Sequence, residues 1–277
     1  MENLLREIYP KRKPWTHKGE HGYVLIVAGS KQYSGSPVFN AMSALRAGAD
    51  LVTIVGPRRA MDIAAGFLPD LICYPLNGDY LEPKHASEIL KISQNFNSLV
   101  IGGGLGRNQK TLRAINEIIK KIDLPIVIDA DAIHALAEEK AVLKNKKVII
   151  TPHLREFEIL TGEKLLPNVS GRKEKVKKWA QKLGVTILLK GHIDVISDGQ
   201  RVAFNKTGSP YMTKGGFGDT LAGICGAILA RGVSPFKAAC AAACLNGRAG
   251  ELAVKKYGEG VIASDIFPEI PKVIGNG

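Results

Sequence analysis

Residues 99–128, LVIGGGLGRNQKTLRAINEIIKKIDLPIVI, contain one complete strand–helix–strand unit. The apolar runs Leu99–Ile101 and Ile126–Ile128 predict two short strands that are buried on both faces. Between them, Gln109–Lys121 places its leucine and isoleucine side chains at helical spacing, which predicts an amphipathic helix. Because a helix that returns the chain across one face of a sheet joins parallel strands, this unit predicts a parallel sheet.

The same alternation of strands and helices extends through most of the chain. Further strands are expected at Tyr23–Ala28, Leu51–Val55, Leu71–Tyr74, Val148–Ile150 and Thr186–Leu189, followed by a hairpin of Val195–Ser197 and Arg201–Phe204 around Asp198-Gly199. Further helices are expected at Pro37–Ala49, capped by Ser34 or Ser36, and at Lys173–Leu183, Gly216–Ala230 and Pro235–Lys255. We therefore predict one α/β domain over residues 1–277, with helices on both faces of a mostly parallel sheet.

The formal net charge of +12 raises the question of an anionic partner. Much of this charge lies in short runs, which favours solvated positions: Lys11–Lys13, Lys144–Lys147, Arg172–Lys178 and Lys255–Lys256. The run Arg172–Lys178 also follows an apolar helical rhythm, so we interpret it as the solvated face of a helix. No RNA- or DNA-binding motif is present, and no nucleic acid partner is expected.

Cysteine usage and the N-terminus indicate the cellular compartment. The four cysteines have neither disulfide-rich nor zinc-site spacing, which indicates free thiols in a reducing environment: Cys73, Cys225, Cys240 and Cys244. The first residues lack the apolar core of a signal peptide, and no apolar stretch is long enough to span a membrane. We expect a cytoplasmic protein that does not bind membranes.

A glycine-rich segment, Lys214–Thr220 (KGGFGDT), opens the predicted helix that follows it. The glycines leave backbone N–H groups exposed at a helix N-terminus, where an anion such as a phosphate binds. An aspartate in that first turn repels phosphate, but it suits a general base that removes a proton from a hydroxyl attacking the phosphate. Asp219 is therefore the candidate base, with a simple helix cap as the alternative. The Gly-Lys-Ser/Thr ending of a Walker A loop is missing.

Other polar and glycine-rich segments also follow predicted strands, where ligands bind in open parallel sheets. Lys190-Gly191 offers a cation for phosphate and close backbone approach, although an ordinary turn explains it equally well. Thr151-Pro152-His153 with Glu156 suits a substrate contact and a hydrated Mg²⁺, unless His153 is purely structural.

Two aspartates and two further loops complete the set. Asp129 and Asp131 can hold a metal or place charge near phosphates, unless Asp131 only caps a helix. The loop Gly102–Arg107 permits a bulky ligand to approach, but Arg107 stands where the third glycine of a dinucleotide-binding fingerprint belongs. The segment Ala28–Ser36 follows the first strand.

The order of these motifs resembles the ribokinase-like superfamily, and within it the dehydratases that repair hydrated NADH and NADPH. The similarity covers roughly residues 17–270 and includes His17-Lys18-Gly19 and Ala44–Ala49 besides the motifs above. It implies a three-layer αβα sandwich and a lyase that uses ADP, or else ATP, with Mg²⁺. In this family the nucleotide phosphorylates the C6 hydroxyl of the S form of hydrated NAD(P)H, and loss of phosphate restores the nicotinamide ring.

The resemblance also implies a role for individual residues. Asp219 would be the base, and the turn of Gly215, Gly216, Phe217 and Gly218 would hold the charge on the transferred phosphoryl group. The adenine nucleotide would contact Lys190, Gly191, His192, Ile193, Asp194 and Gly218. The hydrated dinucleotide would contact Ser36, Gly104, Gly106, His153 and Asp219, and the metal would lie near Asp129 and, through water, Glu156.

Three departures from the family pattern are visible. Gly103 stands where proline is usual, Phe217 replaces a small or hydroxyl residue, and Thr207–Met212 is a loose version of Gly-Asn-x-Gly-Met. We expect Phe217, bulky and beside the catalytic aspartate, to alter rate or nucleotide choice. His153 is typical of the dehydratases, whereas related vitamin kinases often carry asparagine there.

The same sequence is also compatible with two alternative functions. A small-molecule alcohol kinase of this fold would share Asp219 and the glycine-rich turn. A non-catalytic basic RNA-binding module would bind RNA in a strongly salt-dependent way. The resemblance further implies a homo-oligomer, such as a tetramer. No epimerase domain is expected within the chain, so the epimerase of the same repair pathway would be a separate protein.

Overall fold

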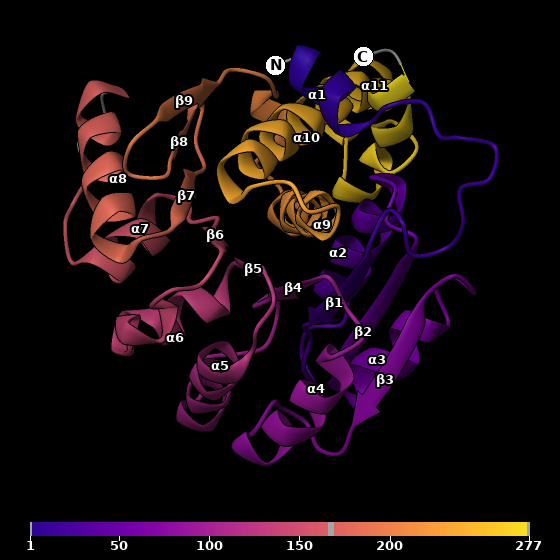
Figure 1. Ribbon diagram of the computed structural model, residues 1–277, viewed down its shortest axis with the longest axis vertical. Helices are drawn as coiled ribbons and strands as arrows, with labels where there is room; N and C mark the ends of the chain where they lie inside the picture. The colour runs from indigo at the N-terminus through magenta and orange to yellow at the C-terminus, as the bar shows by residue number, and fades with distance from the viewer. Residues whose placement is uncertain (1, 166–168, 276–277) are drawn as a thin grey trace.

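One nine-stranded sheet passes through the molecule (Figure 1). The computed structural model describes residues 2–165 and 169–275. The strands are β1 (Tyr23–Val27), β2 (Leu51–Pro57), β3 (Ile72–Leu76), β4 (Ser98–Ile101), β5 (Ile126–Ile128), β6 (Val148–Ile150), β7 (Thr186–Leu189), β8 (Asp194–Ser197) and β9 (Val202–Asn205). Their spatial order is β3-β2-β1-β4-β5-β6-β7-β8-β9. The first seven are parallel, and β8 and β9 form the predicted antiparallel hairpin at one edge.

Helices cover both faces of this sheet, which confirms the predicted αβα sandwich (Figure 1). One layer contains α2 (Gly35–Arg46), α3 (Arg58–Ala65), α9 (Phe217–Ala230) and α10 (Pro235–Tyr257), and α1 (Glu2–Ile8) and α11 (Ile270–Gly275) pack beside it. The other layer contains α4 (Ala86–Ser93), α5 (Gln109–Lys121), α6 (Asp131–Glu138), α7 (Leu154–Thr161) and α8 (Val169–Leu183). Alternate residues of each strand feed the two apolar clusters: in β1, Ile26 joins one and Leu25 the other.

Two details of the predicted helices were wrong. The short helices α1, α3, α4 and α11 were not expected, because helices of six to eight residues span only about two turns and leave little periodic signal. The suggested serine cap of α2 is also absent. Ser34 occupies the cap position without a side-chain hydrogen bond, and Ser36 lies inside the first turn, where its hydroxyl contacts another helix.

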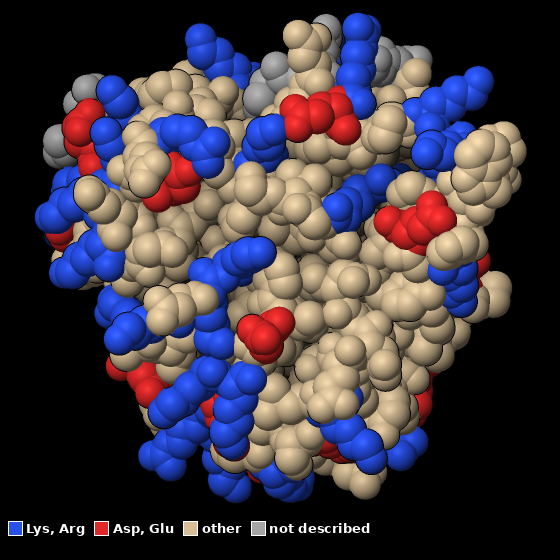
Figure 2. Space-filling model, viewed as in Figure 1, with Lys and Arg blue, Asp and Glu red and all other residues tan. Residues whose placement is uncertain are grey.

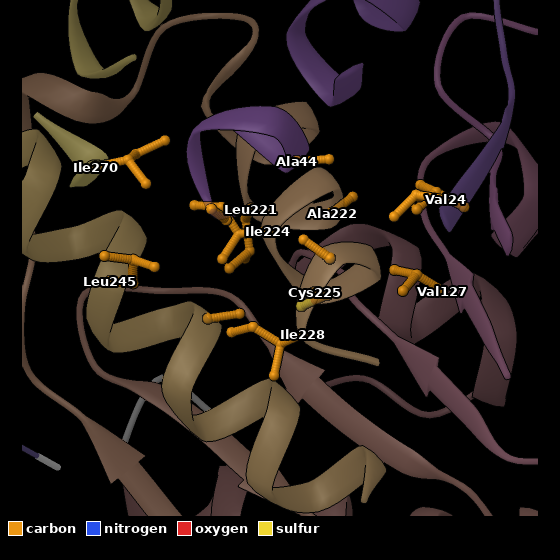
Figure 3. Packing of buried hydrophobic residues seen from close by; sticks show 14 of the residues in the cluster. Val24, Ala44, Val127, Leu221, Ala222, Ile224, Cys225, Ile228, Leu245 and Ile270 are labelled. Carbon is orange, nitrogen blue, oxygen red and sulfur yellow. The ribbon is translucent and has the colours of Figure 1, made fainter. Parts of the chain in front are cut away.

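Helix α9 is buried on nearly all sides (Figure 3). Its apolar residues pack between the strands, α2 and α10, and Figure 3 shows Ile224 and Ile228 directed into this cluster. Two glycines permit the close approach. A Cβ on Gly223 would lie 2.1 Å from the carbonyl oxygen of Asn40 on α2, and one on Gly226 would lie 2.4 Å from Cγ2 of Val100 on β4. The position of the glycine-rich turn that opens α9 is therefore set by tight packing on α2 and the sheet.

The order of the strands reverses between β1 and β4. From β1 the sheet grows through β2 to β3 on one side and through β4 to β9 on the other. At such a switch point the loops leaving the carboxyl ends of the two central strands diverge and leave a crevice between them. The loops after β1 and β4 are the segments 28–34 and 102–108, both singled out in the sequence.

On the face in Figure 2, charge is spread rather than gathered in one stripe. Lysine and arginine side chains lie at several places around the margin and toward the middle, with acidic side chains among them. Cys73, Cys225, Cys240 and Cys244 are all free thiols, as expected. Within the described residues, no helix is long and apolar enough to cross a membrane.

Candidate active site

The glycine-rich turn, residues 215–218, forms the N-terminus of α9 as predicted. Gly216 is the N-cap and has φ = 98°, a left-handed conformation, and a Cβ there would lie 2.7 Å from Cβ of Ala263. The first N–H groups of a helix have no acceptor within it, so this turn presents free donors at the positive end of the helix dipole. The Phe217 side chain is only 5% exposed and lies in the apolar cluster, so only its backbone belongs to the turn.

Asp219 lies in the first turn of α9, inside the helix rather than at its cap. Burial, followed by the charge of Asp129, raises the pKa of Asp219 from 3.8 to about 7. The hydroxyl of Ser36 donates to Oδ2 at 3.3 Å, and Asn40 Nδ2 donates to the Asp219 carbonyl at 2.6 Å. A carboxyl group with this pKa exchanges a proton readily at neutral pH, which is the property of a general base.

Gly103 forms the other wall beside this carboxyl group. A Cβ on Gly103 would lie 2.6 Å from Oδ1 of Asp219 and 3.1 Å from Cβ of Ser36. The departure from proline at this position therefore leaves space that the Asp219 side chain occupies.

Lys190, directly after β7, reaches into a cluster of three carboxyl groups, those of Asp129, Glu156 and Asp219. Its Nζ lies 2.9 Å from Oδ1 of Asp129 and 3.9 Å from Oε2 of Glu156. It also faces α9, because a Cβ on Gly218 would lie 3.3 Å from Nζ. Burial lowers the pKa of Lys190, but the charges of Asp129 and Glu156 raise it, and the net shift is upward. The cluster thus holds one permanent cation among three carboxyl groups, counting Asp219.

His153 and Glu156 lie together at the start of α7, as their spacing predicted. His153 is the N-cap: its Nδ1 accepts from the N–H groups of Arg155 and Glu156, while Glu156 Oε2 accepts from the His153 N–H at 2.8 Å. Burial raises the pKa of Glu156, although Lys190 lowers it. Nδ1 of His153 caps the helix and Nε2 lies 3.4 Å from Oε1 of Glu156, while the side chain as a whole is 53% exposed and open to a ligand.

The β7–β8 loop, residues 190–194, is closed by its own aspartate. Asp194 accepts from the Gly191 N–H at 2.9 Å and from Asn205 Nδ2 at 2.9 Å. Burial raises the pKa of Asp194. Its carboxylate therefore shapes the loop, whereas Gly191 and His192 are exposed at its surface and Ile193 is half-buried.

A cavity of about 750 Å³ opens at the topological switch point. Its walls come from the loops after β1, β3, β4 and β5: Gln32, Tyr33, Ser36, Tyr80, Glu82, Gly104, Gly106, Arg107, Asn108 and Asp131. Ser36 lines the cavity and also contacts Asp219, so it connects this space to the carboxyl cluster. A cavity of this size accommodates a ligand as large as a nucleotide.

Asp131 organises the far wall of the cavity. It is the first residue of α6, and instead of capping the helix its carboxylate accepts from the Gly106 N–H at 2.9 Å and from Arg107 Nε at 2.6 Å. The alternative that Asp131 only caps α6 is therefore wrong. Asp129 is also engaged, since its Oδ1 accepts from Thr151 Oγ1 at 2.8 Å as well as from Lys190.

The structure brings most of the predicted residues into one continuous region. Ser36, Asp129, Glu156, Lys190 and Asp219 are linked by the distances above, and Gly104 and Gly106 line the adjoining cavity. Two contributors were missed. Asn40, inside α2, looked like an ordinary helical residue, and Tyr80 lies in a loop with no motif; the sequence carries no signal for either.

The carboxyl cluster does not form a complete protein site for a metal ion. Among the described residues, no group of three or more His, Cys, Asp or Glu is arranged to hold one. Mg²⁺, however, usually keeps several waters and is held by one or two carboxylates together with substrate phosphates. Asp129 and Glu156, beside the N-terminus of α9, supply a donor set of that kind.

Comparisons of this chain with known proteins all indicate the same family. A model of the NAD(P)H-hydrate dehydratase family matches residues 24–272. The bifunctional NAD(P)H-hydrate repair enzyme of Pyrobaculum aerophilum is 43% identical over 265 residues, which cover 95% of this chain and 52% of that protein. The chain thus spans about half the length of the bifunctional curated relatives that it matches.

Shorter relatives and a solved structure align over nearly their whole length. The ADP-dependent (S)-NAD(P)H-hydrate dehydratase of Cenarchaeum symbiosum is 38% identical over 274 residues, covering 99% of this chain and 95% of that protein. The crystal structure of the ADP/ATP-dependent NAD(P)H-hydrate dehydratase of Bacillus subtilis, co-crystallised with ATP/Mg²⁺, is 27% identical with a TM-score of 0.87, covering 100% of this chain and 97% of that one. The fold is ribokinase-like, as predicted. Because the family match extends from β1 to α11, this protein belongs to the NAD(P)H-hydrate dehydratases.

Proposed function

We propose that this protein dehydrates the S form of hydrated NADH or NADPH and consumes ADP, or else ATP, in doing so. The observation that carries the proposal is Asp219, a half-buried carboxyl group with a pKa raised to about 7 at a glycine-rich helix N-terminus, joined through Ser36 to a cavity of about 750 Å³. A base, an anion-binding turn and a dinucleotide-sized space together suit phosphoryl transfer to a hydroxyl of a large substrate.

The residues divide the reaction between them. Asp219 removes the proton from the C6 hydroxyl as its oxygen attacks the terminal phosphorus of the nucleotide. The N–H groups of residues 215–218 and the Lys190 ammonium stabilise the negative charge on the transferred phosphoryl group. The C6–O bond then breaks and phosphate leaves with the bonding electrons, while the neighbouring ring carbon loses a proton and its C–H electron pair forms the double bond of NAD(P)H.

The two substrates occupy different sides of the cluster. We place the adenine nucleotide against the β7–β8 loop, since Lys190 begins that loop and faces Gly218 on α9. The hydrated dinucleotide occupies the cavity lined by Ser36, Gly104 and Gly106, where Tyr33 and Tyr80 offer aromatic faces for stacking. Mg²⁺ accompanies the phosphates, held by Glu156 through water and by Asp129, and it neutralises phosphate charge.

Assembly, partners and location are proposed with the same reaction. The edge strand β3 exposes the side chains of Ile72 and Tyr74, which supports a homo-oligomer that we expect to be a tetramer. An epimerase of the same repair pathway would supply the S form of the substrate. Free cysteines and a metabolic repair reaction support a cytoplasmic location, with no nucleic acid or membrane partner.

Absorbance at the reduced-nicotinamide band tests the function directly. The protein is mixed with hydrated NADH, Mg²⁺ and either ADP or ATP, and a nucleotide-dependent rise is expected, with release of phosphate. A flat trace from correctly folded protein, together with a stable phosphorylated product from an alcohol, would instead establish a small-molecule kinase.

His153→Asn separates the two roles that the structure allows for this histidine. Asparagine is a good N-cap, so α7 keeps its start and the melting temperature should change by less than about 2 °C. Loss of the imidazole edge should raise KM for the hydrated dinucleotide roughly tenfold, since a hydrogen bond contributes about 1 kcal/mol or more. Steady-state kinetics and a thermal melt measure both. An unchanged KM would restrict His153 to capping α7.

A further inference from the structure

Arg172 differs from the other cations of its helix. The run Arg172–Lys178 was expected to be a solvated face, and Lys173, Lys175 and Lys178 are indeed near the surface in ion pairs with glutamates. Arg172 is half-buried instead, and its Nε is buried without a hydrogen-bond partner. Within residues 2–165 and 169–275, no carboxylate forms an ion pair with it. The expectation of a wholly solvated face is therefore wrong at this residue.

The guanidinium of Arg172 lies over the start of the β7–β8 loop. A Cβ on Gly191 would be 2.9 Å from Nη1, so the group rests directly against the Gly191 backbone. Gly191 follows Lys190, whose Nζ reaches the carboxyl cluster at α9. The carboxylate that closes this loop, that of Asp194 at the start of β8, already accepts from the Gly191 N–H and from Asn205. Lys190 of this loop and Arg172 of α8 thus place two cations at adjacent loop residues, and within the described ranges Lys190 alone has a carboxylate partner.

An unpaired, partly buried arginine favours an anionic ligand. Arginine carries its charge at all ordinary pH values, and a partly desolvated charge without a counter-ion is costly. Its planar fork of donors matches phosphate oxygens, to which it often binds through two parallel hydrogen bonds. Glycine at position 191 allows the guanidinium to lie directly against the loop backbone, since a side chain there would displace Nη1.

We propose that Arg172 binds the phosphate chain of the adenine nucleotide, beside Lys190. The proposal rests on the proposed function, which places the nucleotide at the β7–β8 loop, and it adds a residue from α8 to that site. Lys190 faces the phosphoryl group that is transferred, at the N-terminus of α9. Arg172 contacts the phosphate nearer the ribose, one loop residue further from the reacting atoms. It therefore contributes to nucleotide affinity and leaves the chemical step unchanged.

Calorimetric titration with ADP and with adenosine tests this role. Arg172→Gln should weaken ADP binding roughly tenfold or more, the usual effect of losing a hydrogen bond to a charged group, and leave adenosine binding unchanged. Arg172→Lys keeps the charge without the fork and should fall between the two. In turnover, Arg172→Gln should raise KM for ADP and preserve kcat. Lys173→Gln removes an equal charge from the neighbouring position of α8 and should change neither ligand.

Each other outcome has a distinct meaning. Equal losses for ADP and adenosine, or no loss for ADP, would overturn the phosphate contact, because the residue would then support the loop or touch the nucleoside. Lys190→Met tests the nucleotide site itself. If Lys190→Met weakens ADP binding and Arg172→Gln does not, only the role of Arg172 is wrong. If neither variant weakens it, the placement of the nucleotide at this loop is wrong as well.

Discussion

Asp219→Asn is expected to lower kcat/KM by about 10³-fold, within the usual range for removing a general base. Asparagine keeps the size and the Ser36 hydrogen bond but cannot accept the proton of the attacking hydroxyl. The absorbance assay with hydrated NADH measures the loss, and ADP binding by calorimetry serves as the control, since the glycine-rich turn remains intact. Residual activity near that of the unaltered protein would remove Asp219 from the mechanism.

The pH dependence of the same reaction follows from the raised pKa of Asp219. The base must be ionised, so kcat/KM should fall about tenfold per pH unit below a midpoint near the raised pKa of Asp219, about 7. Because the charge of Asp129 contributes to the upward shift, Asp129→Asn should move this midpoint to lower pH. A pH–rate profile of both proteins decides the point.

Stability supplies an independent check on Asp219. In the unfolded chain this carboxyl group ionises near 3.8, whereas in the folded chain it ionises near 7, so the folded state binds more protons between these values. The free energy of unfolding therefore falls as pH rises from about 4 to about 7. Asparagine removes this loss, and the melting temperature of Asp219→Asn relative to the unaltered protein should be higher at pH 8 than at pH 5.

Lys190→Met should produce the second large effect, on both stability and activity. It removes the one cation that stands between Asp129, Glu156 and Asp219. Removing one partner of a buried ion pair typically costs about 3 to 5 kcal/mol, and we expect the low end because the Lys190 side chain is 21% exposed. KM for ADP should also rise roughly 10- to 100-fold through loss of a charged phosphate contact.

A double variant separates these two effects. Lys190→Met combined with Asp129→Asn no longer leaves that carboxylate without a counter-ion, so denaturant unfolding should show that much of the lost stability returns. The ADP affinity should remain low, because the phosphate contact is still missing. Recovery of ADP affinity along with stability would mean that Lys190 acts only by holding the fold together.

The sequence was sufficient for the layers of the fold and for the edge of the sheet where chemistry occurs. Apolar runs and helical periodicity depend on local chain geometry. The strand–helix–strand unit predicted for residues 99–128 therefore matches the bounds of β4, α5 and β5 almost to the residue. The glycine-rich turn was recognisable for the same reason, since Gly216 needs a positive φ that few other residues adopt. The helices α3 and α4, of eight residues each, were too short to show a period.

Only the tertiary structure decided how the site works. The Ser36 hydroxyl and the Asp219 carboxylate are 183 residues apart in sequence, and they meet because Gly223 lets α9 pack against α2. The raised pKa of Asp219 and the unpaired charge of Arg172 arise in the same way, from burial and from neighbours on other elements. Desolvation and Coulomb interactions depend on distances in space. Strand and helix patterns therefore located the candidate residues along the chain, whereas packing determined their contacts and pKa values.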